Sequence, residues 1–181
     1  MPKKEEEYEV EFPSSKGPHF KITVVGEPAV GKTTLVRSFT GKKLRDEYMP
    51  TLGVEITVKR MNVKETQVTL MMWDLAGQPQ FKIVRPLYYK GSAGAVFMYD
   101  VTMPHTLARV DDWVHECFSA VSGIPGVLIG NKIDLKESRI VDRSTAEARA
   151  ARLGLRYFET SAKLGQNIEA PLMWLLAEII K

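Results

Sequence analysis

The sequence contains one cysteine and no long apolar run. Cys117 is the single cysteine among 181 residues, which excludes an internal disulfide and a cysteine-based zinc site. It occupies an apolar position in a predicted helix, so we expect a buried thiol rather than a reactive one. Because no apolar run is long enough to span a bilayer and no secretory hydrophobic region opens the chain, we expect a cytoplasmic protein without a transmembrane segment.

A strong excess of charge of one sign is also missing. The chain has 25 basic and 22 acidic residues, a formal net charge of +3, and no long basic block, so charge gives no reason to expect nucleic acid as a partner. With 44% hydrophobic residues, its length suits one domain with a sizeable core. We predict a charged, flexible extension over residues 1–18 and one domain over residues 19–181. Tyr8, Val10 and Phe12 alternate with glutamates, which leaves a short edge strand open within the extension.

Apolar strand patterns alternate with amphipathic helical patterns from residue 20 onward, which is typical of an α/β sheet with crossover helices. Strands are predicted at residues 20–26, 53–63, 66–74, 93–100, 126–131 and 155–159. Helices are predicted at residues 32–40, 80–90, 105–122, 143–153 and 166–180. The second and third strands are joined by a short charged turn and should pair as an antiparallel hairpin. The predicted fold is a six-stranded mixed sheet with helices on both faces, and ligands should bind beyond the carboxyl ends of its strands.

The stretch GEPAVGKTT, residues 26–34, lies between the first strand and the first helix. Gly26, Gly31, Lys32 and Thr33 satisfy the pattern GxxxxGK[ST] in the context of a phosphate-binding loop. Glycines let the backbone turn its N–H groups toward a polyphosphate at the positive end of a helix. Lys32 can reach the outer phosphate oxygens, and the Thr33 hydroxyl can ligate Mg²⁺. The alternative is an ordinary glycine turn before a helix. We predict nucleotide contacts from Ala29, Val30, Gly31, Lys32, Thr33 and Thr34.

Two further segments supply candidate metal and catalytic residues. Thr51 lies in a polar loop, where its hydroxyl could complete the Mg²⁺ shell when a third phosphate is present. Asp74 ends the third predicted strand as the expected acid of a nucleotide site, and the Gly77 N–H can approach a terminal phosphate. Gln78 could orient a water for in-line attack, although DLAGQ alone could be a turn. The metal candidates are Thr33, Thr51 and Asp74, and the catalytic candidates are Gln78, Lys32 and Thr51.

Two polar loops after the last strands, GNKID and ETSAK, indicate guanine as the base. The Asp134 carboxylate can accept two hydrogen bonds from one edge of guanine, whereas adenine offers no such pair. Lys132 could lay its stem along the base, Asn131 could tie its loop to the phosphate loop, and the Ala162 N–H could meet the guanine carbonyl. The alternative is a capped helix start and an unrelated polar loop. The predicted base contacts are Asn131, Lys132, Asp134, Ser161, Ala162 and Lys163.

GEPAVGKT, Thr51, WDLAGQ, NKID and TSAK follow one another in this order and together resemble the small GTPases of the Ras superfamily, over residues 20–181. TLGVEI, WDLAGQ, YYKG and YDVT are similar to the Rab and Ran branches, and IEAPLMWL leans toward Ran. The resemblance implies a GTP/GDP switch with slow, Mg²⁺-dependent GTP hydrolysis in trafficking- or transport-type regulation. It also implies a monomer whose effectors, exchange factors and GTPase-activating proteins contact residues 43–55 and 75–90.

Several positions depart from the family pattern. Pro28 stands in the phosphate loop where a small residue is usual, and its missing N–H leads us to hypothesise impaired stimulation by an activating protein. Leu44 replaces an aromatic ring that stacks on guanine, so nucleotide release should be faster than is usual. Pro79 follows Gln78 where a glutamate is usual, which suggests a stiffer switch. Tyr48 could close over the phosphates, and no arginine stands there to act in cis, so unaided hydrolysis should be slow.

Two alternative functions stay open beside the switch. A nucleotide-bound interaction module that does not cycle is favoured by Pro28 and Pro79 and opposed by Gln78 and Thr51. A P-loop kinase or ATPase is opposed by the guanine-reading carboxylate. The sequence ends EIIK with no cysteine for a prenyl group, so either the protein is not lipidated or a lipid-carrying tail is not included. The last helix has its apolar residues on one face and should pack on the sheet.

Overall fold

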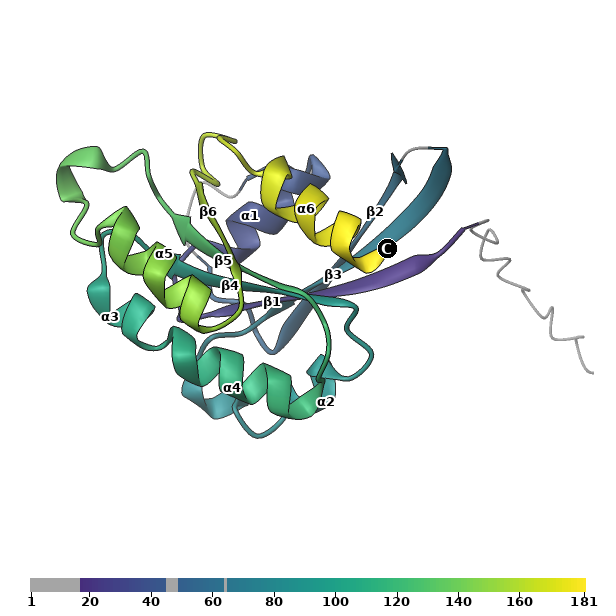
Figure 1. Cartoon of the computed structure of the whole chain (residues 1–181), viewed down its shortest axis with the longest axis horizontal. Coiled ribbons are helices and arrows are strands. Elements are labelled where there is room, and N and C mark those ends of the chain that lie inside the picture. The colour runs from purple at the N-terminus through teal and green to yellow at the C-terminus, as the bar shows by residue number, and fades with distance from the viewer. Residues whose placement is uncertain (1–16, 45–48, 64) are drawn as a thin grey trace, which may run out of the picture.

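The computed structural model describes residues 17–44, 49–63 and 65–181. Six strands form one sheet in the order β2-β3-β1-β4-β5-β6 (Figure 1). β2 and β3 are antiparallel, and the other neighbours are parallel, which confirms the predicted mixed sheet. The strands are β1 (His19–Gly26), β2 (Val54–Val63), β3 (Thr66–Leu75), β4 (Gly94–Asp100), β5 (Gly126–Asn131) and β6 (Arg156–Thr160).

Helices cover both faces of the sheet, as predicted (Figure 1). α1 (Lys32–Thr40) and α6 (Glu169–Ile179) pack on one face. The other face is covered by α2 (Arg85–Tyr89), α3 (Pro104–Ala108), α4 (Val110–Ala120) and α5 (Arg143–Arg152). Two 3₁₀ turns, η1 (Pro79–Phe81) and η2 (Lys136–Ser138), complete the elements.

The central strands are apolar at successive positions because both of their faces are buried. In β1, Val24 belongs to the core under α1 and α6, and Val25 to the core on the opposite side. In β4, Met98 and Tyr99 divide in the same way. The period of two in side-chain direction therefore builds two cores from one continuous apolar run.

Three predicted helices differ in extent from the observed ones. Residues 80–90 form η1 and the short α2, because Pro86 has no N–H and its ring would clash with a preceding carbonyl in a longer helix. Residues 105–122 divide into α3 and α4 at Arg109, whose ψ of −9° departs from the α-helical value of about −42°. α6 begins later than residue 166, because Gln166 pairs with Ser161 through two backbone hydrogen bonds of 2.9 and 3.1 Å.

Two smaller expectations are confirmed. Cys117 is fully buried, and burial raises the pKa of its thiol to about 12. Leu172, Leu175 and Leu176 of α6 pack on the sheet. Among the described residues no helix is long and apolar enough to cross a membrane. Most of the predicted extension, with its alternating aromatic residues, lies outside the described residues, as does Tyr48.

Candidate functional site

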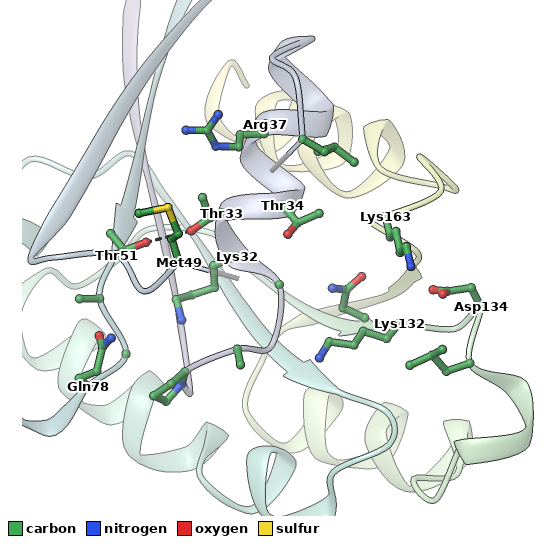
Figure 2. A pocket seen from close by; sticks show the side chains of 18 residues that line it. Lys32, Thr33, Thr34, Arg37, Met49, Thr51, Gln78, Lys132, Asp134 and Lys163 are labelled. Carbon is green, nitrogen blue, oxygen red and sulfur yellow. Dashed lines mark hydrogen bonds between the residues drawn. The ribbon is translucent and has the colours of Figure 1, made fainter. Parts of the chain in front are cut away.

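A cavity of about 380 Å³ lies at the carboxyl ends of β1, β3, β5 and β6. Figure 2 shows Thr51 and Gln78 at one end, Lys132, Asp134 and Lys163 at the other, and the loop before α1 between them. Five segments that are separated in the sequence thus share one space. Its lining is Pro28, Ala29, Gly31, Lys32, Thr33, Thr34, Arg37, Leu44, Met49, Thr51, Ala76, Gly77, Gln78, Asn131, Lys132, Asp134, Leu135 and Lys163.

The loop between β1 and α1 has the close-packed backbone that its sequence requires. Gly31 has φ +103°, and a Cβ there would lie 2.2 Å from Nδ2 of Asn131. Ala29 has φ +63°, in the left-handed region that costs an L-residue about 1–2 kcal/mol. The loop therefore holds a strained backbone against the base-side loop, as functional turns often do.

Lys32 lies inside this loop. Its Nζ donates to the carbonyls of Gly26 and Glu27, each at 2.9 Å. The side chain is buried, and burial lowers the pKa of its amine to about 8, while the carboxylates of Asp74 and Glu27 partly oppose that shift. A triphosphate beside Nζ would favour the charged form again.

Two hydroxyls and one carboxylate meet next to Lys32. The Thr33 hydroxyl lies 2.9 Å from that of Thr51 and donates to Oδ2 of Asp74, which also accepts from Thr51 at 3.4 Å. Oδ1 of Asp74 is buried without a hydrogen-bond partner among the described residues. Burial raises the pKa of Asp74, against the hydrogen bond from Thr33 and the charge of Lys32. A hard cation would satisfy the buried carboxylate oxygen, so this set fits Mg²⁺.

The described part of the chain contains no group of three His, Cys, Asp or Glu side chains that could hold a metal ion. A cation here would therefore need hydroxyl and phosphate oxygens in addition to the Asp74 carboxylate. That requirement matches Mg²⁺, which is usually bound through one or two carboxylates together with substrate phosphates and water.

Gly77 and Gln78 follow β3 at the phosphate-side end. A Cβ on Gly77 would lie 2.6 Å from the carbonyl oxygen of Gly26 and 2.7 Å from the nitrogen of Pro28. Only glycine permits this approach of the two backbones. The Gln78 side chain lines the cavity at the Thr51 end (Figure 2), where it could orient a water.

Arg85 links Gln78 to α4. Its Nη1 donates to the Gln78 carbonyl at 3.3 Å, and Nε and Nη2 donate to the two carboxylate oxygens of Glu116 at 2.6 and 2.9 Å. The guanidinium lies over the Trp113 ring at 4.3 Å, and Trp113 Nε1 donates to Glu27 at 2.9 Å. One face of α4 therefore contacts the phosphate loop directly, through Trp113 and Glu27, and is connected to the backbone of Gln78 through Arg85 of α2.

Asn131 organises the other end of the cavity. Its Nδ2 donates to the Val30 carbonyl at 2.8 Å, which is the tie to the phosphate loop that the sequence suggested. Its Oδ1 accepts from the Thr160 hydroxyl and from the Ala162 N–H, both at 3.0 Å. Ala162 thus donates to Asn131 in this structure, where the sequence suggested a contact with guanine.

Lys132 and Asp134 are also held by neighbours. Lys132 has φ +70°, and its Nζ forms an ion pair of 2.6 Å with the buried carboxylate of Asp100. Asp134 accepts from the Ser161 hydroxyl at 2.6 Å. Lys132 and Asp134 both line the cavity. Asp100 is not among the residues that the sequence predicted for this site, although its place at the end of β4 is the same signal that pointed to Asp74.

Most of the predicted site residues that the structure describes line the cavity, and four others lie outside its lining. Thr160 and Asp100 support the base side, and the predicted residues Val30, Asp74, Ser161 and Ala162 are not part of the lining. Val30 contributes a carbonyl, while its side chain belongs to the core. Five lining residues were not predicted as site residues: Pro28, Arg37, Met49, Ala76 and Leu135.

Comparisons with known proteins agree with this geometry. The model of the Ras family matches residues 21–181. The chain belongs to the Ras family. It is 36% identical over 163 residues to the Ras-related protein Rab-21 of Mus musculus, covering 90% of this chain and 73% of the relative.

Two further relatives lie at similar distance. The GTP-binding protein YPTM1 of Zea mays is 35% identical over 163 residues, covering 90% of this chain and 78% of its own length. The Ras-related protein Rab-13 of Bos taurus is 31% identical over 162 residues, which cover 89% of this chain and 80% of the relative. This Ras-family chain is therefore a small GTP-binding protein of the Rab-like type, in a family whose members hydrolyse GTP and generally bind Mg²⁺.

Proposed function

We propose that this protein is a GTP/GDP switch with slow, Mg²⁺-dependent GTP hydrolysis, in trafficking- or transport-type regulation. The supporting observation is the single cavity that joins the phosphate loop to Asp134. The names of the Rab relatives support the cellular setting. The GTPase domain would span residues 19–181 after an extension over residues 1–18, and residues 43–55 and 75–90 would contact effectors and regulators.

In this proposal the chain supplies position and charge. Gln78 orients a water whose oxygen attacks the γ-phosphorus, and the bond from that phosphorus to the β–γ bridging oxygen breaks, giving GDP and phosphate. Lys32 stabilises charge on the outer phosphate oxygens. Mg²⁺ at Thr33, Thr51 and Asp74 would neutralise charge on the β- and γ-phosphates. When the γ-phosphate leaves, Thr51 and Gly77 lose a partner and both segments relax.

The slow rate follows from the positive groups available. Lys32 is the cation inside the phosphate loop, while Arg37, which also lines the cavity, is paired with Glu55 at 2.9 Å. An arginine that reaches the transferring phosphate is worth roughly 10³–10⁵ in rate. Unaided hydrolysis should therefore be slow, and an activating protein would need to supply that group.

Base selection and hydrolysis can be tested in one set of proteins. We expect the purified protein to bind GDP and GTP and to discriminate against ADP and ATP in calorimetry. Asp134→Asn should lose guanine affinity and gain affinity for xanthine nucleotides, because an amide N–H can donate to the 2-oxo group of xanthine. Asp112→Asn, on the exposed side of α4, is the matched control.

Single-turnover hydrolysis separates the switch from a module that does not cycle. The parent should convert bound GTP to GDP slowly, and Gln78→Leu should slow that conversion while GTP still binds. If the parent binds GTP but never hydrolyses it, even over many hours with Mg²⁺, the non-cycling module replaces the switch. Binding of adenine and guanine nucleotides with equal affinity would reject the guanine site.

A further inference from the structure

Trp113 of α4 and Glu27 of the phosphate loop are far apart in the sequence and form a direct hydrogen bond. The indole Nε1 of Trp113 donates to Oε1 of Glu27 at 2.9 Å, and Nε of Arg109, at the start of α4, lies 3.7 Å from the same oxygen. Trp113 is 5% exposed and the Glu27 side chain is 22% exposed. A charge-assisted hydrogen bond in such a shielded place is stronger than one between neutral groups. We call it the Trp113–Glu27 contact.

The Glu27 backbone contacts the side chain of Lys32. Nζ of Lys32 donates to the carbonyls of Gly26 and Glu27, each at 2.9 Å. The residue whose side chain is held by α4 is therefore also one whose carbonyl orients the amine. A shift of Glu27 would move one of the two acceptors on which the position of Lys32 depends.

The Glu27 backbone also packs against the residue that precedes Gln78. A Cβ on Gly77 would lie 2.8 Å from the carbonyl carbon of Glu27 and 2.7 Å from the nitrogen of Pro28. The two backbones are thus in close contact, and groups packed this tightly transmit a displacement to one another. The position of Glu27 therefore limits where Gly77, and with it Gln78, can lie.

The ring of Trp113 is connected to Gln78 by a second route. The Arg85 guanidinium lies over the ring at 4.3 Å, and Nη1 of Arg85 donates to the Gln78 carbonyl at 3.3 Å. α2, which begins at Arg85, and α4 lie side by side on one face of the sheet (Figure 1). Trp113 consequently contacts the phosphate loop through its N–H and is linked to the Gln78 backbone through its ring and Arg85.

The chemistry of the side chains suits this arrangement. Indole has one N–H donor at the ring edge and a face that attracts a cation. An ionised carboxylate accepts hydrogen bonds and donates none. Trp113 can therefore serve Glu27 and Arg85 at the same time, which a phenylalanine could not do because it has no donor.

We propose that Trp113 and Glu27 are positioning residues for GTP hydrolysis, which hold Gln78 in register with the phosphate loop. This inference rests on the proposed function. In-line attack requires that the water oriented by Gln78 lie opposite the bond that breaks, and a small displacement of the orienting group lowers the rate. The loss should appear in the hydrolysis of bound GTP more than in nucleotide affinity, because Asp134 and Lys163 lie at the opposite end of the cavity (Figure 2).

The experiment measures single-turnover hydrolysis of bound GTP with Mg²⁺, and GDP dissociation from the same proteins. Trp113→Phe keeps a ring beneath Arg85 and removes the donor to Glu27. Hydrolysis should slow about five- to tenfold, the order of one intramolecular hydrogen bond, while GDP dissociation should change less than hydrolysis. Glu27→Gln should slow hydrolysis less than Glu27→Ala, because the amide oxygen can still accept from the indole.

A second background shows whether the effect passes through Gln78. In Gln78→Leu the orienting amide is already missing, so adding Trp113→Phe should slow hydrolysis little further. Substitutions that act through one group are non-additive, whereas independent effects add. A merely structural role for Trp113 would instead slow hydrolysis by the same factor in both backgrounds.

Trp174→Phe is the matched control. Trp174 belongs to α6 and packs against the core on the opposite face of the sheet, where its ring lies 6.4 Å from that of Phe158. The substitution removes the same indole N–H from a half-buried helical position. It should leave the hydrolysis rate at the parent value, whatever it does to the melting temperature.

The outcomes separate this inference from the function beneath it. If the parent does not hydrolyse GTP, the proposed function fails and this inference fails with it. If the parent hydrolyses GTP and Trp113→Phe does so at the same rate, only the role of the Trp113–Glu27 contact is rejected. Equal slowing in the Gln78→Leu background, or in Trp174→Phe, would also reject that role. Should Trp113→Phe not fold, the two Glu27 variants carry the test, and parent-like rates in both would reject the inference.

Discussion

The base-side and phosphate-side ends of the cavity are built differently. On the base side, Asn131, Thr160 and Ser161 are 2%, 0% and 0% exposed, and their polar atoms are hydrogen-bonded within the chain. On the phosphate side, Leu52 and Ile83 are 81% and 88% exposed in the segments after α1 and β3. Buried contacts resist local opening and exposed segments open readily. In the proposed switch, base recognition therefore belongs to the rigid end, and the response to the γ-phosphate belongs to the more exposed end.

The largest effect is expected from a substitution at the base-side end of the cavity. Asn131→Ala removes three hydrogen bonds and leaves the Val30 carbonyl, the Thr160 hydroxyl and the Ala162 N–H without their partner. At about 1–3 kcal/mol for each buried group left unpaired, we expect unfolding free energy in urea to fall by about 3 kcal/mol or more. Guanine nucleotide affinity should fall with it. Asn62→Ala, exposed on β2, should cost little, and equal losses in both variants would contradict this comparison.

The next effect concerns the largely buried ion pair between Arg85 and Glu116, which connects the Gln78 carbonyl to α4. Burial alone would raise the pKa of Glu116, but hydrogen bonds from Arg85 and Tyr89 hold it below its usual range. Glu116→Gln should cost about 2 kcal/mol of unfolding free energy at neutral pH, the scale of a hydrogen bond to a charged group. Hydrolysis should slow as well, because Arg85 also holds the Gln78 carbonyl.

The stability cost of Glu116→Gln should depend on pH, and the lowered pKa of Glu116 fixes the direction of that dependence. A carboxylate whose pKa is lower in the folded state stabilises the fold above its unfolded value, about 4.3 for glutamate, and loses this contribution as pH falls through the folded pKa. The difference in unfolding free energy between the parent and Glu116→Gln should therefore shrink below about pH 4. Glu147→Gln, in an exposed pair with Arg143, is the control. A difference that stays constant from pH 7 to pH 3 would rule out the ion pair as its source.

The smallest effect is expected in the loop between β1 and α1, which lies between the two ends of the cavity. Ala29→Gly removes a Cβ from a residue at φ +63°, which relieves strain, while glycine adds entropy to the unfolded chain. We expect a net gain of under about 1 kcal/mol in unfolding free energy, measured in urea without nucleotide. A loss of stability in this variant would mean that the Ala29 methyl contributes packing that outweighs its backbone strain.

The sequence anticipated the parts of the site that depend on local chemistry. The spacing of Gly26, Gly31 and Lys32 required a strand, a loop and a helix in that order, and the apolar runs required strands buried on both faces. Asp74 and Asp134 could be found because each ends or follows a strand. The helices were harder, since Pro86 and Arg109 shorten helices whose apolar periodicity continues past them.

What the sequence determined by itself is the type of ligand site, because glycine, lysine, hydroxyl and carboxylate at fixed spacing carry their chemistry with them. What only the tertiary structure decided is which groups stand behind that site. Arg37 with Glu55, Lys132 with Asp100 and Arg85 with Glu116 are partners across different elements, and no periodicity or motif relates their positions. Such pairs depend on how helices and strands pack, so they appear only when the sheet and its two helical layers are assembled.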